Sequence, residues 1–226
     1  MIARKDRYKI WNSGTAFWPC RAICRFVSSV FFDLKVHHPD FVPETGGVLI
    51  VSNHLSFLDP PFLGSQILRP MNYMAKSELF KPGPIDKALR SMNAFPIRQG
   101  EGDIGAVRET INRLKEGALL NIFPEGSRSE DGELQTILPG VALVIRKAEV
   151  PVIPCVIEGT FEAWGPGQKW PRSFPVDLMF GPRLPVEGLK GPAIVQLIGK
   201  TFAEMQTKLR EMRRKSGRGH NFIPGL

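Results

Sequence analysis

Short apolar runs separated by polar turns recur along the middle of the chain. The runs that predict buried strands lie at residues 48–51, 72–75, 94–97, 118–123, 152–157 and 176–180. Stretches with helical spacing follow most of them, at residues 60–68, 84–92, 103–115, 141–148 and 193–212. This alternation predicts an α/β fold, in which a mixed, largely parallel sheet is flanked by helices.

The first 35 residues have a different pattern, with aromatic side chains placed between basic ones. Their longest uncharged run, residues 10–20, is too short for a helix that spans a bilayer. The pattern is typical of an amphipathic helix in a membrane interface, and the alternative is a helix packed on the protein. We therefore predict an interfacial segment at residues 1–35 and one domain at residues 36–226.

Composition and charge narrow the choice of partners. Apolar residues make up 42% of the 226 residues and charged residues 23%, which is ordinary for a globular protein. The net charge of +8 favours an anionic partner such as a phospholipid surface, a phosphorylated substrate or nucleic acid. No nucleic-acid-binding motif is present, so nucleic acid is not an expected partner. The basic tail at residues 208–220 is expected to be a frayed, solvated end or a lipid contact.

The three cysteines are too few and too scattered for a disulfide framework. They are Cys20, Cys24 and Cys155, and an odd, sparse set is typical of a reducing compartment. All three lie in apolar stretches, so we interpret them as small buried hydrophobic residues.

A histidine and an aspartate follow the first predicted strand. His54 lies just past its end and Asp59 comes five residues later. Only a tight turn between strand and helix would fold Asp59 back onto His54. A carboxylate bonded to one imidazole nitrogen fixes the tautomer and leaves the other nitrogen free as a base. The alternative is a loop histidine beside an aspartate that caps the helix.

Two further polar sites follow predicted strands. Arg98 comes after residues 94–97, and Glu125 comes after residues 118–123. Parallel sheets bind ligands at the carboxyl ends of their strands, so these residues and His54 can converge on one site. Within the stretch F-P-E-G-S-R-S at residues 123–129, Arg128 can hold a phosphate with two parallel hydrogen bonds. The alternative is a surface turn in which Glu125 and Arg128 pair with each other.

Four blocks of sequence, all within residues 45–160, together resemble the glycerolipid acyltransferases. They are N-H-L-S-F-L-D-P at 53–60, F-P-I-R at 95–98, F-P-E-G-S-R-S at 123–129 and V-I-P-C-V-I at 152–157, in the order of that family. The best-known members are the 1-acylglycerol-3-phosphate acyltransferases. Two positions depart from the family pattern. Ser127 replaces a common threonine, and I-L-P-G at 137–140 replaces a common Phe-Lys-x-Gly. The lysine that is missing from the second stretch bears on which acceptor headgroup the protein recognises.

The resemblance implies transfer of a fatty acyl group from acyl-CoA or acyl carrier protein to the hydroxyl of lysophosphatidate. Glycerol-3-phosphate or another lysolipid is the alternative acceptor, and a catalytically inactive lipid-binding protein is a distant alternative. His54 would be the general base and Asp59 would orient it. The residues that would bind or shape the site of the acceptor phosphate are Arg98, Glu125, Gly126, Ser127 and Arg128.

The same resemblance implies no metal and no resident cofactor, because the acyl thioester is a co-substrate. The expected partners are an anionic phospholipid surface, the acyl thioester and the lysophospholipid acceptor. The expected location is the cytoplasmic face of a membrane, with the protein bound as a peripheral or monotopic enzyme.

Overall fold

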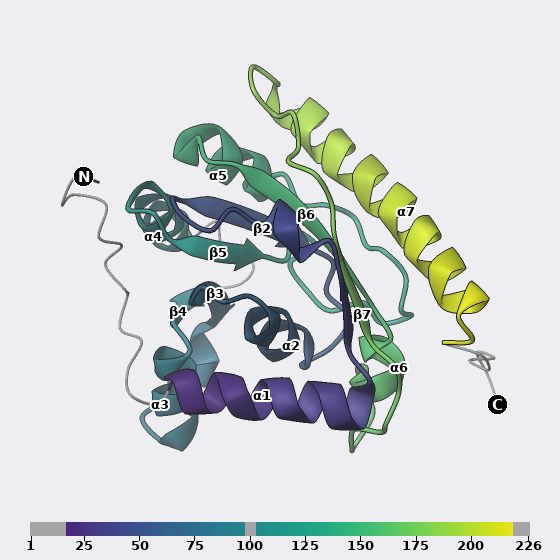
Figure 1. Ribbon diagram of the computed structural model, residues 1–226. Helices are drawn as coiled ribbons and strands as arrows, with labels where there is room; N and C mark the ends of the chain where they lie inside the picture. The colour runs from purple at the N-terminus through teal and green to yellow at the C-terminus, as the bar shows by residue number, and fades with distance from the viewer. Residues whose placement is uncertain (1–16, 98–102, 219–226) are drawn as a thin grey trace, which may run out of the picture.

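The computed structural model describes residues 17–97 and 103–218 (Figure 1). The strands are β1 Lys35–His37, β2 Val48–Ser52, β3 Met71–Lys76, β4 Ala94–Ile97, β5 Leu119–Ile122, β6 Val152–Glu158 and β7 Asp177–Phe180. The α-helices are α1 Phe17–Phe32, α2 Asp59–Gln66, α3 Pro84–Ser91, α4 Ile104–Lys115, α5 Gly140–Ala148, α6 Thr160–Trp164 and α7 Gly191–Lys215. Two short 3-10 turns occupy Pro39–Phe41 and Ser77–Leu79.

The described strands form one sheet in the order β1-β7-β6-β2-β5-β3-β4. Every neighbouring pair is parallel except β6 and β7, which are antiparallel. The predicted mixed, largely parallel sheet is therefore confirmed. The central pair, β2 and β5, places the segments that follow them next to each other at the same edge of the sheet.

Helices cover both faces of the sheet (Figure 1). Along β2, Leu49 and Val51 pack with residues of α4, α5 and α7, whereas Val48 and Ile50 pack with residues of α2. Successive side chains of a strand point to opposite faces, so a central strand between two helical layers must be apolar at every position. All five residues of β2 are buried accordingly.

Helix α1 lies outside α2 and packs against it, with the rings of Phe32 and Phe62 5.0 Å apart. Its other face leaves a set of large apolar side chains in solvent, namely Trp18, Ile23, Phe26, Val30 and Phe31. The alternative of a helix packed on the protein is therefore confirmed for α1, whereas contact of its exposed apolar face with a membrane stays a prediction. Among the described residues, no helix has the length and apolar character needed to span a bilayer.

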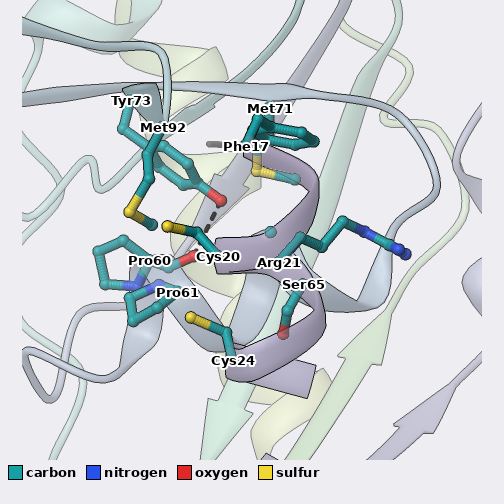
Figure 2. A pocket seen from close by; sticks show the side chains of 11 residues that line it. Phe17, Cys20, Arg21, Cys24, Pro60, Pro61, Ser65, Met71, Tyr73 and Met92 are labelled. Atoms are coloured by element: carbon teal, nitrogen blue, oxygen red, sulfur yellow. Dashed lines mark hydrogen bonds between the residues drawn. The ribbon is translucent and has the colours of Figure 1, made fainter. Parts of the chain in front are cut away.

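A small, mostly apolar crevice lies between α1, α2 and β3 (Figure 2). Cys20 and Cys24 line it together with Pro60 and Pro61, and the Tyr73 hydroxyl donates to the Pro60 carbonyl at 2.8 Å. Both cysteines are only half-buried, so the prediction of buried thiols is wrong for them, whereas Cys155 is fully buried. Neither His54 nor Asp59 lines this crevice.

The C-terminal basic stretch is built into the fold as far as it is described. Helix α7 continues to Lys215, and the buried guanidinium groups of Arg213 and Arg218 pair with Asp177 of β7. His37 also contacts this aspartate, with Nε2 2.9 Å from Oδ1. The prediction of a frayed or lipid-contacting tail is therefore wrong for these two arginines, because Asp177 gives them a buried partner.

Candidate active site

The turn between β2 and α2 brings His54 and Asp59 together. Nδ1 of His54 lies 2.8 Å from Oδ2 of Asp59. The same oxygen accepts the backbone N–H groups of Leu55 at 2.6 Å and Ser56 at 2.7 Å. The carboxylate thus closes the turn by binding both its backbone and the imidazole.

These contacts determine which imidazole nitrogen carries the proton. Asp59 is fully buried, and its Oδ2 already accepts two backbone N–H groups. An ionised carboxylate can only accept hydrogen bonds, so Nδ1 of His54 must be the donor. Nε2 is then unprotonated in the neutral imidazole and can act as a base. The imidazole ring stacks on Phe123, with the ring centroids 3.9 Å apart.

Two further polar side chains hold the turn in place. The Asn53 carboxamide donates to the Ile157 carbonyl at 2.9 Å and accepts the Ile157 N–H at 2.7 Å. The Ser56 hydroxyl donates to the Trp164 carbonyl at 2.7 Å. Asn53 thereby fixes the backbone just before His54 to β6, and Ser56 fixes the next part of the turn to α6. The sequence offered one signal for this role, a polar amide directly after an apolar strand, and our sequence-based interpretation did not use it.

The loop after β5 closes on the same turn. The backbone N–H of Ser129 donates to the His54 carbonyl at 2.8 Å. Gly126 has a φ of +77°, and a Cβ atom there would lie 2.5 Å from Cδ1 of Leu138. A side chain at this position would be strained by the left-handed backbone and would also displace the half-exposed Leu138 side chain, so this path favours glycine. Ser127 is exposed next to it.

Arg128 has an unusual environment for a guanidinium group. Its Cζ lies 3.6 Å from the centre of the Phe57 ring, and Nη1 is buried without a hydrogen-bond partner among the described residues. Burial lowers the pKa of Arg128, but a guanidinium stays charged in proteins. A charged donor that is buried and unpaired can take an anion as its hydrogen-bond partner. The alternative in which Arg128 pairs with Glu125 is wrong, because no bond joins them.

Glu125 comes three residues before this arginine in the sequence and is buried, with 6% of its surface exposed. Neither of its carboxyl oxygens has a well-formed hydrogen bond to another described residue. Burial raises the pKa of Glu125 to about 8; the backbone N–H of His54 opposes this shift and the charge of Asp59 adds to it. Glu125 is therefore mostly protonated at neutral pH and does not cancel the positive charge of Arg128.

This burial predicts a pH-dependent free energy of unfolding. Glu125 has a higher pKa in the folded protein than in the unfolded chain, so its stabilising contribution is present at about pH 4.5 and is lost as the pH rises to about 8. Between those limits, wild type should lose on the order of a few kcal/mol relative to Glu125→Gln. Urea unfolding of both proteins across this range measures the difference, in which other titrating groups cancel. If the free energy of unfolding of the two proteins changed with pH in the same way, Glu125 would not be a buried neutral carboxyl in the folded protein.

The second block of the sequence is only partly described. Strand β4 ends at Ile97, and Arg98 lies outside the described residues. In the sheet, β4 is separated from β5 by β3. The role of Arg98 therefore stays a prediction from the resemblance. Residues 17–97 and 103–218 contain no cluster of three histidine, cysteine or acidic side chains that could hold a metal.

Comparisons with known proteins agree with the four blocks. The family described as "Acyltransferase" matches residues 33–158. A 1-acyl-sn-glycerol-3-phosphate acyltransferase of Bacillus subtilis (strain 168) is 30% identical over 142 residues, which cover 62% of this chain and 70% of that protein. The 1-acyl-sn-glycerol-3-phosphate acyltransferase beta of Homo sapiens is 26% identical over 209 residues, which cover 91% of this chain and 74% of that protein.

The solved structure of a 1-acyl-sn-glycerophosphate (LPA) acyltransferase from Thermotoga maritima has the same fold. It superposes with a TM-score of 0.74 at 23% identity, covering 85% of this chain and 79% of that one. The matched family region spans more than half of the chain and contains both β2 with its turn and β5 with its loop. The chain therefore belongs to the acyltransferase family, which confirms the prediction of an O-acyltransferase.

Proposed function

We propose that the protein transfers a fatty acyl group from an acyl thioester to the hydroxyl of lysophosphatidate, forming phosphatidate. The observation that carries the proposal is a candidate base next to a candidate anion site. The His54–Asp59 pair and the loop of Arg128 are joined directly by the hydrogen bond from Ser129 N–H to the His54 carbonyl. The named activity of the bacterial and human relatives supports this choice of acceptor.

In the proposed reaction, Nε2 of His54 removes the proton from the acceptor hydroxyl as its oxygen attacks the thioester carbonyl. The new C–O bond forms, the tetrahedral intermediate collapses and the C–S bond breaks. His54 then returns the proton to the departing thiolate. Asp59 holds the imidazole through Nδ1 and stabilises the imidazolium between these two proton transfers. No covalent enzyme intermediate is required, and the thiol carrier is coenzyme A or acyl carrier protein.

Recognition of the phosphate is assigned to the loop after β5. Arg128 would donate charge-assisted hydrogen bonds through its unpaired buried nitrogen. Glu125, protonated at neutral pH, would donate a further hydrogen bond instead of repelling the anion. Gly126 lets the backbone take its left-handed path, and Ser127 adds an exposed hydroxyl beside it. Arg98 keeps the phosphate-binding role that the resemblance implies.

Replacing Arg128 with alanine is expected to raise KM for lysophosphatidate by about 10- to 100-fold, since a hydrogen bond to a charged group contributes about 1.5–3 kcal/mol. KM for the acyl thioester should change much less. Lysine at this position should restore only part of the loss, because it lacks the planar fork that also stacks on Phe57. Arg183→Ala, which removes an exposed arginine paired with Glu187, is the matched control. An equal rise of both KM values in Arg128→Ala would contradict phosphate binding.

The proposal includes contact with a membrane, because the acceptor and the product are lipids. The exposed apolar face of α1 is the candidate contact, and the helix also exposes Arg25 and contains no acidic residue. Interfacial helices combine large apolar side chains with basic ones in this way. The enzyme would thus bind as a peripheral or monotopic protein on the cytoplasmic face.

An acceptor panel tests the proposed function. One labelled acyl thioester is offered with lysophosphatidate, glycerol-3-phosphate and neutral lysolipids, and the released thiol and the lipid products are measured by absorbance and mass spectrometry. We expect phosphatidate as the main product. If glycerol-3-phosphate or a neutral lysolipid were acylated faster than lysophosphatidate, that compound would be the acceptor and the proposed acceptor would be wrong. Absence of thiol release with every acceptor would favour a lipid-binding protein without activity.

A further inference from the structure

The loop between α6 and β7 holds the most exposed large apolar side chain of the described residues. Trp170 is 81% exposed, and Lys169 and Pro171 on either side of it are exposed as well. An indole has a large apolar surface and one N–H donor, so it is most stable where an apolar phase meets water. A single exposed apolar side chain is common on protein surfaces, so what Trp170 does depends on the surface around it.

Hydrogen bonds hold this loop in its position on α6. Arg172 donates from Nε to the Glu162 carbonyl at 2.6 Å and from its backbone N–H to the Ala163 carbonyl at 2.9 Å. On the other side of Trp170, Gln168 donates to the Phe161 carbonyl at 3.1 Å. The residues before and after Trp170 are therefore tied down, and the exposure of the indole is a property of the fold.

The same loop is bonded to the end of α1. The Ser173 hydroxyl donates to the Phe31 carbonyl at 2.6 Å, and the Val176 N–H donates to the Phe32 carbonyl at 2.9 Å. Figure 1 shows α6 and the segment after it beside the C-terminal end of α1. The loop of Trp170 thus adjoins the helix that exposes Phe26 and Phe31.

The charge of the two segments is complementary to an anionic surface. Residues 17–32 and 165–175 contain no aspartate or glutamate, and their basic residues are Arg21, Arg25, Lys169 and Arg172. Each basic residue close to anionic lipid headgroups adds to the attraction, while the aromatic side chains insert among them. Arg21 is turned toward α2, where its Nε donates to the Ile67 carbonyl. Asp33, directly after α1, is paired with Arg218. The exposed basic side chains are therefore Arg25, Lys169 and Arg172, and together with the exposed aromatic rings they match an anionic phospholipid bilayer.

Helix α6 also connects this loop to the reacting groups. The Trp164 carbonyl accepts the Ser56 hydroxyl, and the Trp164 ring centre lies 5.8 Å from that of Phe57. The guanidinium group of Arg128 in turn stacks on the Phe57 ring. A bilayer bound by the loop would therefore lie close to the turn that carries His54.

We propose that the loop at residues 165–175 is a second membrane-contact element, in which Trp170 enters the headgroup region of an anionic bilayer beside α1. Two separate contacts, one from the helix and one from the loop, fix the orientation of the protein on the surface, which one contact cannot do. The inference rests on the proposed function, because it describes how that site reaches a lipid acceptor.

Co-sedimentation with vesicles tests the loop separately from the helix. Vesicles of phosphatidylcholine with phosphatidylglycerol are mixed with wild type, Trp170→Ala, Trp170→Phe and Phe26→Ala. Trp170→Ala should lower the bound-to-free ratio by about tenfold, while Trp170→Phe should keep most of the binding because it keeps an aromatic ring. Phe26→Ala removes an exposed ring of α1 and so measures how much the helix contributes to vesicle binding. Leu143→Ala, an exposed apolar residue of α5 on the opposite side of the sheet (Figure 1), is the matched control and should bind like wild type.

Equal binding of Trp170→Ala and wild type would overturn the inference, and so would a loss as large in Leu143→Ala. Light scattering without vesicles provides a further test. A dimer that Trp170→Ala abolishes would overturn the inference in favour of a second copy of the chain. Failure of the proposed function has a different signature, since wild type would then release no thiol with any acceptor, whatever its binding to vesicles.

Discussion

Replacing His54 with alanine should lower kcat for lysophosphatidate by roughly 10²- to 10⁴-fold, the usual contribution of a positioned general base. The fold should survive, because the carbonyl of residue 54 still accepts the Ser129 N–H and Asp59 still accepts the N–H groups of Leu55 and Ser56. Thiol release at saturating acyl thioester measures kcat, and circular dichroism with thermal unfolding reports on the fold.

Chemical rescue provides the control for His54. The alanine variant leaves a space against the Phe123 ring, on which the imidazole stacks in wild type. Added imidazole should therefore recover part of the lost rate, whereas it should not raise the rate of wild type. Activity close to wild type in His54→Ala, at an acceptor concentration where wild type is saturated, would exclude His54 as the base.

The order of strands and helices was largely predictable because most elements carry a strong local signal. Strand β4 has the predicted bounds, and the apolar runs of β2 and β6 were placed to within one residue. Strand β1 was missed, since Lys35–His37 is short and has no apolar run. Helix α6 was missed because it has only five residues and follows Gly159, whose φ of +95° belongs to a turn. Such elements depend on neighbours that are distant in the sequence.

The candidate site was predictable in its composition but not in its electrostatics. Spacing alone left open whether Asp59 capped the helix or contacted His54. The structure decides for the contact with His54: Asp59 binds the imidazole and the N–H groups of Leu55 and Ser56, which precede α2, and no side chain caps that helix. The sequence likewise left a pair between Glu125 and Arg128 possible. Burial decides the state of that glutamate, and burial depends on packing that no local pattern shows.

Asp59→Asn should lower kcat by roughly 10²- to 10⁴-fold while leaving the turn largely intact. The carboxamide oxygen can occupy the place of Oδ2 and keep all three hydrogen bonds, because the opposite orientation would set its NH₂ group against the N–H groups of Leu55 and Ser56. The NH₂ group then takes the place of Oδ1, which is buried without a partner among the described residues, so the variant should lose about 1–3 kcal/mol of stability there. What is lost is the negative charge that stabilises the imidazolium formed during the reaction.

Asp59→Ala separates that charge from the structural role of the carboxylate. It leaves the N–H groups of Leu55 and Ser56 buried and unpaired, at about 1–3 kcal/mol each, so its free energy of unfolding should fall below that of Asp59→Asn. Steady-state kinetics and urea unfolding of the two variants give the comparison, and Asp86→Asn, which removes a partly exposed carboxylate paired with Arg90, is the matched control. A kcat of Asp59→Asn close to wild type would show that the transition state does not use the charge of Asp59, leaving orientation of His54 as its role.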